Sequence, residues 1–166
     1  MDPAGIQALY RFNTFANENL RTGLLAADEQ VLCTPVEGFW FGSVFSILTH
    51  VLGGETGWLA RLNGAESSPP TPSADDFASV SDMVEAWRKK DAEWEEWAAK
   101  QTPESLAVTG RWRRRDGNLY EMQRWQVATH VAIHSTEHRG HATVAMTKLG
   151  VPHSGQDFLD QIRVIA

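Results

Sequence analysis

Apolar residues recur with the spacing of an α-helix in four long stretches of the chain. The pattern predicts helices over residues of about 3–25, 44–62, 82–98 and 124–149. Three of these stretches follow a polar residue suited to capping a helix, namely Asp2, Ser43 and Ser81. Four amphipathic helices of this length bury their apolar stripes by packing together as a bundle.

The segments between these helices carry turn residues instead of a helical period. Residues 28–42 contain a proline and two glycines and are predicted to form a connecting loop, whose aromatic stretch 39–41 packs against the bundle. Residues 67–76 contain three prolines and are expected to cross one end of the bundle. Around Asp116-Gly117, two short apolar runs predict a β-hairpin. The arginines at 113–115 are interpreted as a solvated turn in preference to an anion site.

Composition and charge narrow the fold class and the partners. A chain of 166 residues that is 42% hydrophobic has the size and balance of one globular domain, residues 1–166. We therefore predict an all-α four-helix bundle with a small β-hairpin before the last helix. The net charge of −6 disfavours nucleic acid as a partner, and no apolar run approaches the length of a membrane span. The single cysteine, Cys33, and the absence of a cationic leader favour a cytoplasmic protein.

Four of the six histidines lie in one short stretch of the last predicted helix. At about 100° of rotation per residue, His130, His134, His138 and His141 share one face of that helix. His134 and His138, one turn apart, can converge on a single ion such as zinc or nickel. A third ligand must come from elsewhere, and His50 on the second predicted helix is the candidate. We favour this metal site over the alternative that these are surface histidines or buried histidines with hydrogen-bond partners.

Three glycines share the face of His50 on the second predicted helix, at Gly53, Gly54 and Gly57. A glycine inside a helix costs roughly 1 kcal/mol relative to alanine, so three in register indicate that something approaches this surface closely. Either the facing helix or a ligand above the metal would account for them.

The segment from His134 to His138, HSTEH, also fits the inverted zinc-peptidase pattern, in which the glutamate acts as the base. Peptidases of that kind need a larger architecture and an acidic ligand well downstream, whereas only a short tail follows His138. We therefore favour a different kind of metal protein. In it, Glu137 either orients a ligand histidine or is a surface charge.

Three stretches of the chain resemble the DinB-like and YfiT-like proteins. They are YRFNTFAN at residues 10–17, SVFSILTHVLGGETGWLARL at residues 43–62 and HVAIHSTEHRGHATVAMTKLGVPHSGQD at residues 130–157. The resemblance implies an up-down-down-up four-helix bundle with a three-histidine metal site. It assigns the metal ligands to His50, His134 and His138.

The resemblance also bears on assembly and on one further donor. It implies frequent homodimers, for which Trp94 and Trp97, expected to be exposed, offer support. His141 stands where the family usually has glutamine. This histidine is therefore expected either to join the metal ligands or to orient one of them.

Characterised relatives of this kind include thiol-dependent S-transferases and a maleylpyruvate isomerase, which use bacillithiol, mycothiol or glutathione. The leading hypothesis is a divalent transition metal, zinc or nickel, that activates a low-molecular-weight thiol toward a small-molecule substrate. Arg139 would hold a carboxylate of the thiol or substrate, or form a surface ion pair. One alternative is hydrolysis by metal-bound hydroxide, with His130, His141 or Glu137 as proton carrier. The other is a non-catalytic, metal-stabilised bundle that binds a partner.

Overall fold

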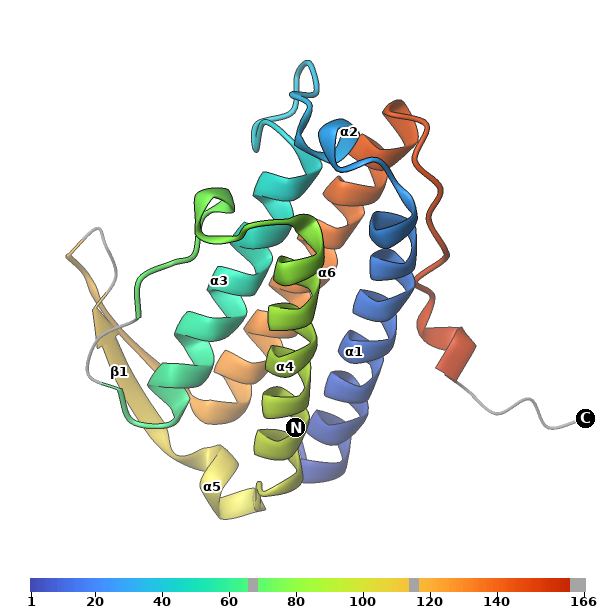
Figure 1. Cartoon of the computed structure of the whole chain (residues 1–166). Coiled ribbons are helices and arrows are strands. Elements are labelled where there is room, and N and C mark those ends of the chain that lie inside the picture. Colours follow the sequence, from blue (N-terminus) through green and yellow to red (C-terminus); the bar gives the residue numbers. More distant parts are fainter. Residues whose placement is uncertain (66–68, 114–116, 162–166) are drawn as a thin grey trace, which may run out of the picture.

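The structure, a computed structural model, describes residues 1–65, 69–113 and 117–161. Four long helices pack together as a bundle; they are α1 (Pro3–Ala26), α3 (Val44–Leu62), α4 (Val80–Ala99) and α6 (Arg124–Lys148). Helices α1 and α6 run in one direction, and α3 and α4 run in the opposite direction (Figure 1). This is the up-down-down-up arrangement that the family resemblance implied.

Local capping residues set the ends of the long helices. The side chains of Asp2 and Ser43 accept backbone N–H groups in the first turns of α1 and α3, as predicted. Helix α4 begins earlier than predicted, because its cap is Ser79 and not Ser81. Gly150, with a φ of 70°, follows the end of α6 in the left-handed conformation that glycine adopts most easily.

Aromatic and aliphatic side chains from all four long helices fill the core. Trp87 and Trp94 of α4 are the largest fully buried side chains, and the Tyr10 ring of α1 stacks on Trp94 with centroids 4.5 Å apart. The expectation that Trp94 and Trp97 are exposed is wrong, since 1% and 5% of their surfaces are accessible. Both rings pack against Tyr10 and offer no surface to a second copy of the chain.

The segment between α1 and α3 is not a plain loop as predicted. Residues Glu29–Cys33 form a short helix, α2, which is capped by the Asp28 carboxylate and packs against α3. A helix of five residues is too short to leave a recognisable period in the sequence. In the aromatic stretch that follows, Phe39 and Phe41 pack against the core as predicted, whereas Trp40 is exposed.

A small helix and a hairpin connect α4 to α6. Helix α5 (Pro103–Ala107) leads into β1 (Thr109–Arg113), which pairs with the antiparallel β2 (Leu119–Gln123). The predicted hairpin before the last helix is therefore confirmed. Residues 114–116 and the side chain of Arg113, on which the solvated turn and the anion site were weighed, lie outside the described residues.

The described residues 69–79 before α4 run along the side of the bundle and do not cross one end as predicted (Figure 1). Because α3 and α4 run parallel, this connection must return to the end where α3 began. It includes a 3-10 turn, η1 (Ala74–Asp76), that contacts α3. A Cβ on Gly53 would lie 2.5 Å from Thr71 Cγ2, so the returning chain itself requires this glycine.

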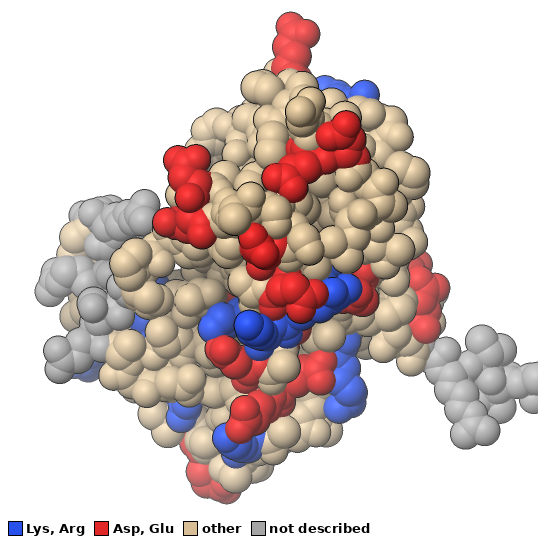
Figure 2. Space-filling view, viewed as in Figure 1, with Lys and Arg blue, Asp and Glu red and all other residues tan. Residues whose placement is uncertain are grey.

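Charged side chains are mixed in sign on the face that α4 presents. Acidic groups are spread over the upper half of this face, and lysines and arginines form a band lower down, beside further acidic groups (Figure 2). Lys90 pairs there with Glu93 and Lys100 with Glu96. Among the described residues, no helix, α4 included, combines the length and apolar character required to span a bilayer.

Candidate metal centre

Helices α3 and α6 lie side by side and bring three histidines together. His50 comes from α3, and His134 and His138 come from successive turns of α6. A Cβ on Gly54 would lie 3.1 Å from Cε1 of His134, so the absence of a side chain lets this ring approach α3. The facing helix thus accounts for Gly54, one of the two explanations that the sequence left open.

The three rings are placed as the ligands of a single ion would be. The Nε2 atoms of His50 and His134 are 3.2 Å apart. The ring centroid of His138 lies 4.9 Å from that of His50 and 4.3 Å from that of His134. One ligand nitrogen from each ring lies within 4.8 Å of the others. Nitrogens that bind one zinc ion at about 2.0–2.1 Å are roughly 3 to 3.5 Å apart, so the cluster fits a divalent cation with little movement.

Burial favours the neutral form of His134 and His138, which is the form that binds metals. Desolvation lowers the pKa of His134 to about 3, and the neighbouring His138 and His50 add to the effect. Desolvation and His50 also lower the pKa of His138, against the opposing charge of Glu137. Neutral nitrogen donors suit borderline cations such as zinc or nickel.

A match to a known protein family covers almost the whole chain. The sequence matches the DinB family over residues 6–164. The chain belongs to the DinB family. No curated protein matches its sequence. This DinB protein therefore combines the bundle with a three-histidine cluster, His50, His134 and His138, that could hold a metal ion.

Two further histidines of the DinB protein flank the cluster. His141 Nδ1 lies 3.4 Å from His138 Nδ1, a contact that would orient the His138 ring and leave its Nε2 for a metal. The exposed His130 ring packs edge-on against Trp58 with centroids 5.6 Å apart, and lies 6.0 Å from the His134 ring. Both rings border the cluster, but neither belongs to its set of three converging nitrogens.

Glu137 lies on a different part of α6 from the cluster. Its side chain is exposed, and together with Leu9 and Ile133 it lines a hollow between α6 and α1. Its charge acts on His138 through space. This placement gives no support to the zinc-peptidase pattern, in which the glutamate works as a base at the metal.

Arg139 is fully buried, so the surface ion pair predicted as one of its two roles is wrong. Its guanidinium donates to Asn13 and Asn17 of α1 and to Gln156, which precedes the 3-10 turn η2 (Phe158–Gln161). The side chain therefore points into the bundle, toward α1. The structure does not bring Arg139 to the three histidines. Nothing in this geometry supports its other predicted role, which is to hold a carboxylate of the thiol or substrate.

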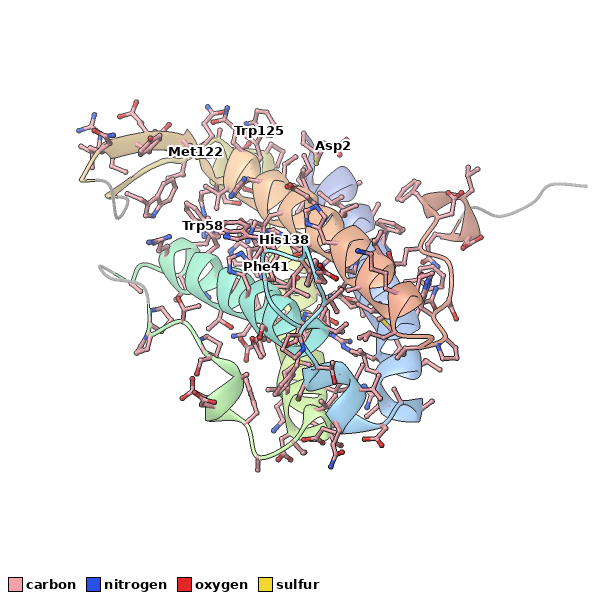
Figure 3. All side chains as sticks on the ribbon, turned by 90° about the horizontal axis from the view of Figure 1, so that it is seen from above. Asp2, Phe41, Trp58, Met122, Trp125 and His138 are labelled. Carbon is pink, nitrogen blue, oxygen red and sulfur yellow. The ribbon has the colours of Figure 1, made fainter. Side chains whose placement is uncertain are left out.

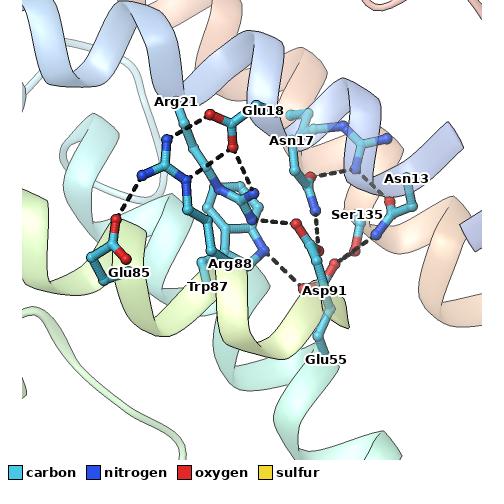
Figure 4. Close-up of polar contacts among 11 residues, drawn as sticks. Asn13, Asn17, Glu18, Arg21, Glu55, Glu85, Trp87, Arg88, Asp91 and Ser135 are labelled. Carbon is cyan, nitrogen blue, oxygen red and sulfur yellow. Dashed lines mark hydrogen bonds and ion pairs between the residues drawn. The ribbon is translucent and has the colours of Figure 1, made fainter. Parts of the chain in front are cut away.

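A buried carboxylate ties α3 to α6 beside the cluster. Glu55 is 0% exposed and accepts hydrogen bonds from Ser135 Oγ at 2.7 Å, Asn13 Nδ2 at 3.1 Å and Trp87 Nε1 at 2.8 Å (Figure 4). Ser135 is the chain neighbour of His134, and Glu55 is the neighbour of Gly54. This contact therefore fixes the height of α6 against α3 where the ligand rings meet.

The same buried network extends to α1 and α4 (Figure 4). Asp91 of α4 accepts a hydrogen bond from Asn17 at 2.8 Å and pairs with Arg21 at 2.5 Å. Burial, with the charge of Glu55, raises the pKa of Asp91 to about 7, although Arg21 opposes the shift. Sequence reasoning missed this network, because a charged residue within a helix is normally assigned to the solvated face.

Phe41 covers one side of the cluster. Its ring centroid lies 5.2 Å from that of His50, 5.0 Å from His138 and 6.4 Å from His141. Seen from above, Phe41 and His138 lie close together between α3 and α6 (Figure 3). The sequence predicted that this aromatic stretch packs on the bundle, but nothing in it indicated that a ring would lie against these histidines.

A cleft of about 520 Å³ opens beside the cluster. His50 lines it, together with Trp58 and Arg61 further along α3. Its floor is the face of α3 that carries Gly53, Gly54 and Gly57, and residues 69–71 of the chain leading to α4 form a wall. Gly53 and Gly54 thus serve close packing, and all three glycines line open space next to a candidate metal ligand.

Proposed function

We propose that this protein is a metal-dependent enzyme that activates a low-molecular-weight thiol for transfer to a small-molecule substrate. The observation that carries the proposal is the double placement of His50, which belongs to the three-nitrogen cluster and also lines the cleft. Three protein ligands beside open space are typical of catalytic metal sites, whereas structural sites are filled by protein. Among the described residues, the cluster has no fourth protein ligand.

In this proposal the protein provides the metal ligands and the proton acceptor, and the metal ion makes the bound thiol more acidic. A divalent cation lowers the pKa of a thiol bound to it, so that the sulfur is nucleophilic at neutral pH. His50, His134 and His138 would hold that cation as neutral imidazoles. In this proposal His130 and His141, the two exposed rings beside the cluster, accept the proton released by the thiol.

The protein's own cysteine is unsuited to this role. Cys33 lies on α2, and burial and the charge of Glu29 raise the pKa of its thiol. An external thiol must therefore provide the sulfur. In the transfer step its thiolate forms the new carbon–sulfur bond, and the leaving group departs with the electron pair of the broken bond.

Conjugation of monochlorobimane tests the proposal. The protein is loaded with zinc or nickel and incubated with the bimane and with bacillithiol, mycothiol or glutathione in turn. We expect metal-dependent conjugation with at least one thiol, with release of chloride. The His138→Ala variant should lose it, and His153→Ala should keep it because that ring contacts Thr147 in the α6–tail region.

Other outcomes of this experiment discriminate between the alternatives. Absence of metal-dependent conjugation with every thiol would refute the proposed transfer. Metal-dependent cleavage of an ester or amide without any added thiol would identify a hydrolase instead. The cleft at His50 argues against the third alternative, a metal that only stabilises the bundle.

A further inference from the structure

The cleft that starts at His50 extends to an arginine. Arg61 lies on the same face of α3, three turns further along, and lines the same cleft as His50. At 1.5 Å per residue, the two positions are about 16 Å apart along the helix axis. A ligand that occupied the whole cleft would therefore be an elongated molecule, with one end at the histidine cluster and the other at Arg61.

Arg61 is held in place by stacking on the ring of Trp58. Its guanidinium carbon lies 4.7 Å from the ring centroid of Trp58. Within the described parts of the chain, no hydrogen-bond acceptor pairs with its nitrogens. Burial lowers the pKa of Arg61, which means that the cation has lost part of its hydration. A stacked guanidinium presents its N–H edge to an oxyanion.

A second hollow of about 240 Å³ adjoins Arg61 next to the hairpin. Arg111 and Arg124 line it together with Arg61. Arg111 pairs with Glu121 at 2.6 Å, and Arg124 donates to the Leu62 carbonyl at 2.8 Å. The buried Nε of Arg124 has no hydrogen-bond partner among the described residues. Three guanidinium groups thus gather in a chain whose net charge is −6.

We infer that Arg61, with Arg111 and Arg124 next to it, binds the anionic end of an elongated ligand whose other end reaches the histidine cluster. The group recognised is an oxyanion, either a carboxylate or a phosphate. The inference rests on the proposed function only for the thiol at the opposite end. The position of Arg61 in the last turn of α3 also suits the helix dipole. A lysine would serve that purpose equally well, so the dipole does not explain the stacked guanidinium.

A matched set of long-chain thiols tests the inference. The probes are mercaptoundecanoate, mercaptoundecylphosphonate and the uncharged mercaptoundecanol, titrated into cobalt-loaded protein and followed by the sulfur-to-cobalt absorption band. We expect the better of the two anionic thiols to bind about tenfold more tightly than the alcohol. In Arg61→Gln this preference should disappear, while binding of the alcohol changes less than twofold. Arg11→Gln, an exposed arginine of α1, should keep the preference.

The outcomes separate this inference from the proposed function. An equal preference in wild type and Arg61→Gln, or no preference in wild type, would overturn the anion site. A stronger preference for the phosphonate or for the carboxylate would support the site and identify the natural anion.

If no thiol changes the cobalt band, the proposed function fails, and calorimetric titration of the metal-free protein with undecanoate and undecanol decides the inference. Binding of the acid that Arg61→Gln abolishes would support it. Equal heats for the acid and the alcohol would overturn it.

Discussion

Two polar clusters lie between the long helices, and they differ in their chemical groups and in their access to open space. The network of Glu55, Asp91, Arg21 and Arg139 consists of carboxyl and guanidinium groups, is almost completely buried, and supplies hydrogen-bond partners to all four side chains. In the histidine cluster burial keeps His134 and His138 neutral, and the cluster borders a cleft at His50. The first is closed by the protein itself, whereas the second faces space that a ligand can enter.

This difference assigns separate roles to the two clusters. Charges buried among their own partners hold the helices in one arrangement, because removing one partner leaves another without compensation. Neutral donors at the edge of a cleft contribute little to that arrangement and are available to a metal. Substitutions in the network should therefore lower stability, and substitutions in the cluster should lower metal binding.

The largest effect is expected when the network loses a cation. Arg139→Met removes the donor to Asn13 and Asn17 and leaves the two nearby carboxylates less compensated. The free energy of unfolding in urea should fall by about 3–5 kcal/mol. Arg11→Met, at an exposed position on α1, should change it by less than about 0.5 kcal/mol. Equal stability of the two variants would show that the network does not hold the bundle.

In the histidine cluster we expect a large loss of metal affinity and little change in stability. His50→Ala should raise the zinc dissociation constant by about 100-fold or more, measured by competition with a chelator, because one of three ligands is lost. The unfolding free energy of the metal-free protein should change by less than about 1 kcal/mol. His153→Ala should leave both quantities unchanged. Similar zinc affinity in His50→Ala and His153→Ala would remove His50 from the site.

Acid should destabilise the metal-free protein through the buried histidine. In the unfolded chain His134 takes up a proton below its ordinary pKa of 6.5, whereas in the folded protein its pKa is about 3. Between these values the unfolded state binds more protons, so the unfolding free energy falls as the pH decreases. With allowance for partial exposure of the ring, His134→Gln should remove roughly 1–2 kcal/mol of this pH dependence. An unchanged pH profile in His134→Gln would contradict burial as the cause.

The smallest expected effect concerns the close approach of the two helices. Gly54→Ala places a Cβ 3.1 Å from the His134 ring, so the ring must move and zinc affinity should fall several-fold. Gly140→Ala is the matched control, because its Cβ would have no neighbour within 4 Å. That variant should keep its zinc affinity and gain roughly 0.5–1 kcal/mol of stability from helix propensity. Equal zinc affinities in the two variants would show that the ring is not confined by α3.

Periodic elements of the fold were predictable from the sequence. Capping residues such as Asp2 and Ser43 act within one turn, and apolar stripes repeat over many residues, so both leave local signals. The short helix α2 left no such signal. The course of the chain between α3 and α4, and the burial of Trp94 and Trp97, depend on how whole helices pack, which local patterns do not contain.

Part of the candidate site was likewise predictable from local sequence spacing, and part was not. His134 and His138 are one turn apart on a single helix, so their spacing alone indicates a pair of ligands. His50 could be added because it stands alone on another apolar helix. Glu55, Phe41 and the cleft at Arg61 gain their meaning only from what lies opposite them in space, and no sequence interval connects them to the histidines.

The central claim is that three imidazoles hold one cation and leave part of its coordination shell open. X-ray absorption spectroscopy of the zinc-loaded protein measures this directly, because it counts imidazole ligands and detects the replacement of a non-protein ligand. We predict three imidazole nitrogens at about 2.0–2.1 Å and one lighter ligand that sulfur replaces when a thiol is added. A shell filled by protein ligands, or one that retains fewer than three imidazoles, would contradict the account.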